Sequence, residues 1–287
     1  MKGIPQGRYT KEFREEAVKI VVGGMSLPEA AGSLITGWKT FMRNIKLVLE
    51  YDGSRYKGWQ RQTTTKSTVQ GRIEHVLQLM TGEKIELHGS GRTDTGVHAL
   101  GQVANFHTQS QKGLSEIEDY LHKYFPDDIN LLDIQEMPER FHARLNAKGK
   151  QYLYQIWNHP FKKNVFNRHY YYHIKKPLNI EKMKQAADLF VGTKDFRSFT
   201  ALKSKNKSTV RTLSKIEILK KESEITINFS GDGFLHRMVR VITGTIIQVG
   251  LGELSVSEIK EMFEKEKRSA AGFTAPPHAL FLVKVIY

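Results

Sequence analysis

The chain has 287 residues, which is enough to bury a sizeable core and predicts about two domains. Lys and Arg number 44 against 30 Asp and Glu, so the net charge is +14, and this predicts a polyanionic partner such as RNA, DNA or an acidic membrane. The absence of cysteine excludes disulfides, thiol nucleophiles and cysteine-based zinc sites.

The positive charge belongs to the main body of the chain. Residues 1–41 hold six of the basic and four of the acidic side chains, so +12 lies in the remainder. The eleven histidines show no His-Glu-x-x-His pattern and no spacing typical of ligands, so we predict no metal site. The sequence has no apolar run long enough to span a bilayer and no signal-peptide core, and we therefore expect a cytoplasmic protein.

The first half of the body mixes strands and helices. One helix has a clear start and stop, because Ser67 or Thr68 can cap it, its apolar residues recur on one face, and Gly82 follows. In chain order we expect a strand over 45–51, this helix from residue 69, a strand from about 84, a strand over 101–107, a helix over 114–124 before Pro126 and a strand over 129–137.

The second half repeats this mixture. Residues 151–157 alternate between two faces, as a strand does, and residues 234–249 place an apolar stripe on one side of a helix. In chain order we expect a strand over 151–157, a helix over 179–191 stopped by Gly192, paired strands over 214–219 and 224–229, a helix over 234–249, a helix after Ser257 and a strand over 280–286. Strand-dominated halves with interspersed helices predict an α+β fold.

The most informative run is Gly89–His98, which holds a cation, a carboxylate and three glycines within ten residues. It fails the dinucleotide pattern because Asp94 stands where a third glycine is needed, and it fails the P-loop pattern because Val97 and His98 follow its last glycine. One interpretation is a reaction centre built on a glycine-rich loop. The alternative is an Asx-turn in which Asp94 caps its own backbone.

Five further motifs surround this run: Tyr51–Gln62, Gly101–His107, Phe141–Arg144, Lys150-x-Tyr152-x-Tyr154 and Phe234–Arg240. In this order they closely resemble the TruA family of tRNA pseudouridine synthases over about residues 42–287. Several separate motifs in order are far more specific than one short pattern. The resemblance implies two similar α+β halves, 42–147 and 148–287, whose antiparallel sheets join across a central catalytic cleft.

The resemblance also implies an activity. Members of the family isomerise uridine to pseudouridine at positions 38–40 of the anticodon stem-loop, without a cofactor, as homodimers that hold one tRNA across both subunits. Two other interpretations of the chain stay open. One is a catalytically silent RNA-binding relative, and the other is a DNA-binding protein led by residues 1–41.

Four residues match the family's active site. Asp94 matches the nucleophile, with attack on the ribose or on the base both open, and Arg240 matches the arginine that holds this carboxylate charged and oriented. Arg92 would contact phosphate or help the target uridine leave the stack, and Tyr152 would stack on the extruded uracil. The alternatives are solvated arginines and a tyrosine that belongs to the core.

Basic side chains beyond the pocket are candidates for contact with RNA phosphates, although each taken singly fits a solvated charge as well. These candidates are Arg55, Lys57, Arg61, Lys203, Lys205 and Arg211. The run 203–208 is richer in lysine than is usual in the family, and Thr95 stands where alanine is usual.

The segment 1–41 differs in character from the rest. Residues 8–18 and 26–31 look like the helix-turn-helix start of an insertion-element transposase, but the residues that follow, 32–39, are too short and glycine-rich for a recognition helix. Met42 resembles a natural start of the synthase. We therefore expect an appended, non-catalytic remnant.

Overall fold

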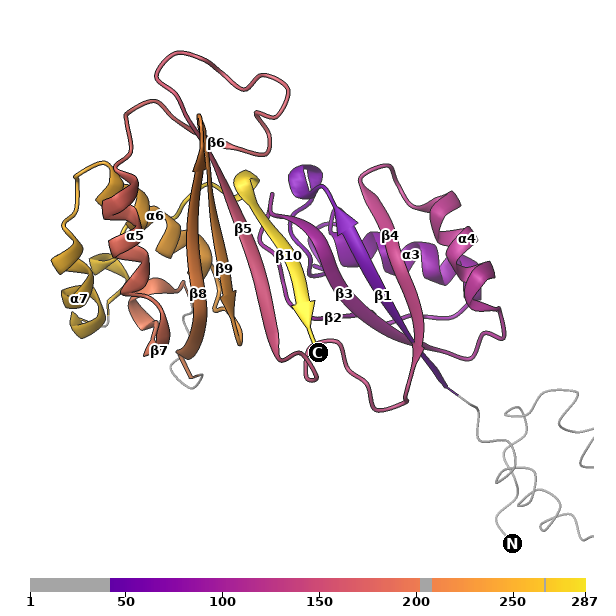
Figure 1. Ribbon diagram of the computed structural model, residues 1–287. Helices are drawn as coiled ribbons and strands as arrows, with labels where there is room; N and C mark the ends of the chain where they lie inside the picture. Colours follow the sequence, from indigo (N-terminus) through magenta and orange to yellow (C-terminus); the bar gives the residue numbers. More distant parts are fainter. Residues whose placement is uncertain (1–41, 202–207, 266) are drawn as a thin grey trace, which may run out of the picture. The chain divides into compact units, whose positions relative to one another are not determined.

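A mixed β-sheet of ten strands runs through the computed structural model, which describes residues 42–201, 208–265 and 267–287 (Figure 1). The strand order is β4-β1-β3-β10-β5-β9-β8-β7, with β2 paired to β3 and β6 paired to β5. Residues 44–287 form one compact unit. The strands are β1 (Arg43–Tyr51), β2 (His88–Gly89), β3 (His98–Thr108), β4 (Ile129–Met137), β5 (Gly149–Asn158), β6 (Tyr172–Ile174), β7 (Gly192–Asp195), β8 (Val210–Lys221), β9 (Glu224–Gly231) and β10 (Leu280–Ile286).

Helices cover the sheet in two groups (Figure 1). The helices α3 and α4 lie at the β1 and β4 end, while α5, α6 and α7 lie at the β8 end, where α5 contacts both α6 and β8. Their bounds are α3 (Val69–Thr81), α4 (Leu114–Tyr124), α5 (Ile180–Asp188), α6 (Met238–Gly250) and α7 (Val256–Lys265). The α+β prediction is thus confirmed.

The last strand of the chain joins the two groups. β10 pairs parallel with β3, with Phe281 opposite His98, and antiparallel with β5 on its other side. The β5–β6 pair is also parallel, whereas the pairs β1–β4, β2–β3, β5–β9, β7–β8 and β8–β9 are antiparallel. The structure therefore has one continuous mixed sheet, where the sequence predicted antiparallel sheets.

Several predicted elements are confirmed at their bounds. The helix α4 and the strands β4 and β10 begin and end as predicted. The start of α3 is set by Thr68, whose side chain accepts a hydrogen bond from the N–H of Gly71. Gly82 ends this helix in the left-handed conformation, with φ of 72°.

Other bounds differ from the prediction for local reasons. The strand expected from residue 84 shrinks to β2, because side chains of α3 bond the backbone of Leu87: Glu74 Oε1 accepts its N–H and Gln70 Nε2 donates to its carbonyl. The helix expected from residue 234 begins four residues later, since Arg237 takes φ of +60°.

The helix α5 ends at Asp188, three residues before the predicted end. The short strands β6 and β7 were not predicted, because three or four residues carry no readable periodicity. The predicted remnant over residues 1–41 lies outside the described residues. Within the described ranges, no helix is long and apolar enough to cross a membrane.

One close approach fixes α6 against the chain that leads into β10. Gly244 is buried in α6, and a Cβ at this position would collide with the carbonyl oxygen of Phe273. Only glycine therefore lets residues 272–275 run along this helix.

We expect Gly244→Ala to lower the free energy of unfolding by about 3 kcal/mol or more, because the added methyl meets backbone that cannot rotate away. Gly82→Ala is the control, since an added Cβ there would have nothing within 4 Å and only its positive φ costs about 1 kcal/mol. Urea denaturation followed by circular dichroism measures both. Equal losses for the two variants would contradict the close approach.

Candidate active site

The carboxylate of Asp94 lies on the loop between β2 and β3 and faces two basic side chains from the second half of the chain. Its Oδ2 accepts a hydrogen bond of 2.8 Å from Arg240 Nη1, and its Oδ1 lies 3.5 Å from His236 Nε2. The side chain remains 22% exposed, so the carboxylate is held in place and still reachable from solvent. The N–H of Gly96 donates to the carbonyl of Tyr56, so this N–H does not close an Asx-turn on Asp94.

Arg240 is fixed on both sides. Its side chain is 11% exposed, and its Nε donates to the carbonyl of Ala275 at 2.7 Å while Nη1 holds Asp94. The N–H of Ala275 in turn donates to the carbonyl of Arg240 at 3.0 Å. The guanidinium is thus a bridge between the Asp94 loop and the segment that leads into β10, and it is not a solvated surface charge.

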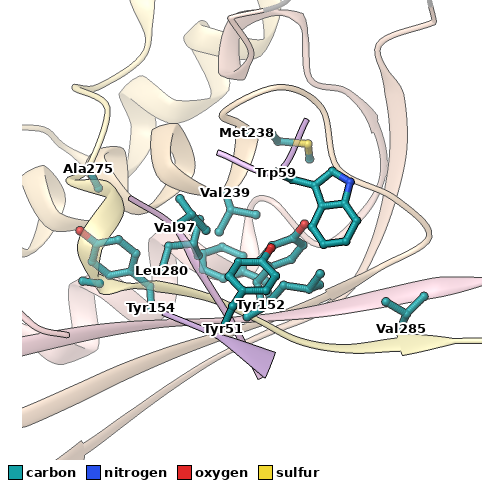
Figure 2. Close-up of a cluster of buried hydrophobic side chains, with 14 of the residues drawn as sticks. Tyr51, Trp59, Val97, Tyr152, Tyr154, Met238, Val239, Ala275, Leu280 and Val285 are labelled. Atoms are coloured by element: carbon teal, nitrogen blue, oxygen red, sulfur yellow. The ribbon is translucent and has the colours of Figure 1, made fainter. Parts of the chain in front are cut away.

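The loop that carries Asp94 rests on a buried aromatic cluster. The N–H of Trp59 donates to the carbonyl of Thr93 at 3.1 Å, and the Tyr51 hydroxyl lies 2.8 Å from Thr93 Oγ1. Figure 2 shows Tyr51 and Trp59 in one buried cluster with Tyr152 and with Met238 of α6. This cluster fixes the backbone one residue before the carboxylate.

Tyr152 lies on β5 within this cluster and is 9% exposed. Its ring packs edge to face against Phe234, with centroids 5.0 Å apart, and burial raises the pKa of its hydroxyl. The hydroxyl makes no hydrogen bond to the part of the chain that the structure describes. Tyr152 is therefore a member of the core, and the Asp94 carboxylate lies near enough to contribute to the raised pKa of its hydroxyl.

Arg92 lies two residues from Asp94, is exposed, and has no ion pair or hydrogen bond with any described residue. Within the described ranges, the loop therefore presents the guanidinium of Arg92 to solvent without a partner, while the guanidinium of Arg240 is held by Asp94 and Ala275. The two predicted arginines differ in their freedom to bind a ligand.

The basic residues predicted to contact phosphate also divide into those that are paired with a carboxylate and those that are not. Arg55 is held by Asp128 through Nε at 2.9 Å and Nη2 at 2.6 Å, and Arg61 forms an ion pair of 3.1 Å, without hydrogen-bond geometry, with buried Glu74. Lys57 is exposed, with no ion pair to a described residue.

Arg211 lies at the start of β8, where its Nη1 donates to the carbonyls of Ser208 and Val210. Lys203 and Lys205 lie outside the described residues. Of the six candidates, Lys57 and Arg211 therefore have no carboxylate partner among the described residues.

The structure brings two further basic residues to the site that the sequence did not single out. His236 faces Asp94, and Lys150 Nζ donates to the carbonyl of Ser90 at 2.8 Å. Both stand inside motifs of the chain, and Lys150 shares the face of Tyr152 two residues away, but no pattern stated their contacts. In the described residues, no group of three His, Asp or Glu side chains is arranged to hold a metal ion.

Comparisons with known proteins match most of the chain. A family model described as tRNA pseudouridine synthase matches residues 47–146 and 186–287. A tRNA pseudouridine synthase A from Bacillus sp. (strain KSM-64) is 49% identical over 81% of this chain and 95% of its own length. One from Acetivibrio thermocellus is 45% identical over 86% of this chain and 100% of its own.

Solved structures are more distant. A crystal structure of the archaeal box H/ACA sRNP Nop10-Cbf5 complex matches 71% of this chain with a TM-score of 0.35 and 10% identity. The chain spans 44% of the length of that protein.

We expect Tyr51→Phe to lower the free energy of unfolding by about 1 kcal/mol, because it leaves buried Thr93 without its hydroxyl partner. Tyr152→Phe is the matched control: it removes the same atom from a neighbouring ring whose hydroxyl has no partner among the described residues. Thermal denaturation of both variants measures the difference. A loss that is equal in the two would show that Tyr51 does not hold the loop.

Proposed function

This chain belongs to the family of tRNA pseudouridine synthases, and on that premise we propose that it isomerises uridine to pseudouridine in the anticodon stem-loop of tRNA, at positions 38–40. The observation that carries the proposal is the Asp94 carboxylate, held by Arg240 and open to solvent in the Gly-Arg-Thr-Asp loop. We expect the protein to act in the cytoplasm, as a homodimer.

The reaction needs a nucleophile and precise positioning. The bond between N1 of the base and C1′ of the ribose breaks, the base turns, and C5 bonds to C1′, while C5 loses a proton and N1 gains one. Atoms and electrons balance within the nucleotide, so no donor takes part. A carboxylate such as Asp94 suits this as a covalent nucleophile, and the bond from Arg240 Nη1 to Oδ2 aims it.

The neighbouring residues fit the handling of an extruded base. An enzyme that acts on a base within a stem takes the nucleotide out of the stack. We expect the guanidinium of Arg92, which has no partner among the described residues, to contact a phosphate of that nucleotide, and Tyr152 to stack on the uracil. These contacts would hold the ribose near Asp94.

The two halves of the body share this work. We infer halves of 42–147 and 148–287 around a central cleft, with Asp94 from the first and Arg240 from the second. The basic body supplies affinity for tRNA, to which Lys57 and Arg211 contribute more than Arg55 and Arg61, whose charges are met by carboxylates.

Asp94→Asn is expected to lower formation of pseudouridine by at least about 10³-fold, because the amide is no nucleophile, while affinity for tRNA stays within about twofold. The measurement is mass mapping of pseudouridine in an unmodified tRNA transcript incubated with purified protein. Asp127→Asn, which removes an exposed carboxylate elsewhere, is the control and should keep full turnover.

Two outcomes of that experiment decide between functions. Substantial turnover by Asp94→Asn would remove Asp94 from the role of nucleophile. A wild-type chain that binds tRNA tightly but forms no pseudouridine would favour a catalytically silent RNA-binding relative.

Deletion of residues 1–41 should leave activity unchanged, because this segment carries little of the charge and the family match begins at residue 47. We infer that it is an appended remnant. A protein of residues 42–287 should fold and modify tRNA at the rate of the full chain, as measured by the same mapping assay. Loss of activity with folding retained would show that the segment contributes to RNA binding or assembly.

A further inference from the structure

Lys150 is a half-buried cation beside the Asp94 loop that the chemistry above does not use. Among the described residues, its Nζ donates one hydrogen bond, to the carbonyl of Ser90 at 2.8 Å. A Cβ added to Gly91 would lie 3.0 Å from this Nζ. The ammonium group therefore sits directly against the loop, three residues before Asp94, with two N–H groups still available.

Two arginines lie close enough to repel this charge. Arg211 lies on β8 two residues from Leu213, which is paired with Gly231, the residue opposite Lys150 on β9. Arg144 follows Ala143, whose carbonyl accepts a hydrogen bond from the hydroxyl of Tyr287, two residues beyond Val285, the residue opposite Lys150 on β10. Burial, followed by these two charges, lowers the pKa of Lys150 to about 8. Arg144 is exposed and has no ion pair among the described residues, and Arg211 bonds to backbone carbonyls alone.

The elements packed around Lys150 supply no compensating carboxylate in the described residues. Across the sheet it is paired with Val285 of β10 and with Gly231 of β9, which are uncharged. Lys150 contacts the Asp94 loop at Ser90. The nearest charged residue of that loop is Arg92, which is another cation, and the carboxylate of Asp94 is already paired with Arg240. The three cations Lys150, Arg144 and Arg211 repel one another without a compensating anion among the described residues, and a bound anion would reverse that cost.

We propose that Lys150, Arg144 and Arg211 together bind one phosphate of the RNA backbone, so that Lys150 positions the Asp94 loop on the RNA through Ser90. The RNA as substrate rests on the proposed function. Lys150 acts here as a positioning residue, since it contacts the phosphate and the loop and does not touch the reacting atoms. The two free N–H groups of its Nζ are the donors to the phosphate.

The proposal has a definite pH dependence. Phosphate binding requires the ammonium form, and free Lys150 loses its proton as the pH rises through its pKa of about 8. Affinity should therefore be complete below that pH and fall above it, by about tenfold between pH 7 and pH 9. A lysine that merely braced the loop would still donate to Ser90 as a neutral amine and would leave RNA affinity unchanged.

Affinity for an anticodon-arm RNA, measured at pH 7 and pH 9 over a range of salt concentrations, tests this. Lys150→Met should bind about tenfold more weakly at pH 7, lose the tenfold change with pH, and lower the salt slope by about one. Lys220→Met, which removes an exposed charge at the far end of β8, is the matched control and should behave as wild type.

Two further variants keep the proposal testable if the Lys150→Met protein does not fold. Arg144→Met and Arg211→Met each remove a phosphate contact and also a repelling charge. Both should weaken binding at pH 7 and move the midpoint of the pH dependence above 8.

Flat wild-type affinity between pH 7 and pH 9, or a Lys150→Met profile equal to that of Lys220→Met, would overturn the proposal. If such a wild-type protein still forms pseudouridine, the proposed function stands and this inference alone fails. If the wild type shows the pH dependence and forms no pseudouridine, the anion site stands and the proposed activity fails.

Discussion

The candidate active site depends on one ion pair between residues 146 positions apart in the sequence, Asp94 and Arg240. The two side chains meet because β10, the last strand, lies parallel to β3 and antiparallel to β5. A partly buried pair of this kind is costly to break, since removal of one partner leaves the other charge without compensation. The geometry of the sheet junction is therefore also the geometry of the site.

The supports of this pair are mostly backbone groups. Arg240 is held by the carbonyl of Ala275, whose approach to α6 depends on the missing side chain of Gly244, and the Asp94 loop is held through the carbonyls of Ser90 and Thr93. Lys150 and Arg240 donate from their side chains, and Trp59 donates from its backbone N–H, so each support binds a main-chain carbonyl and does not depend on which side chain the accepting residue carries. The loop thus keeps Arg92, which has no partner among the described residues, beside a fixed carboxylate.

Local signals explain what the sequence predicted well. The cap of Thr68 and the stop at Gly82 act within one helix, and the bounds of α4 and β4 follow from periodicity and a proline. The motifs of the chain selected Asp94 and Arg240, and the structure brings those two together. Strand pairing is not local, and the continuous mixed sheet was accordingly not predicted from alternation in single strands.

The basic residues show why the sequence alone could not predict which cations of the site are available to bind RNA. Sequence gives the sum of the basic residues, but whether a cation is available depends on partners far along the chain. Arg55 pairs with Asp128, 73 residues later, and Arg61 pairs with Glu74. The charges of Arg144 and Arg211 instead act on Lys150, and neither arginine has a carboxylate partner among the described residues. Folding thus leaves basic side chains without carboxylate partners beside the Asp94 loop, among the described residues. It pairs other basic side chains, such as Arg55 and Arg61, with carboxylates. A net charge predicts that a polyanion binds, and the pattern of ion pairs indicates where.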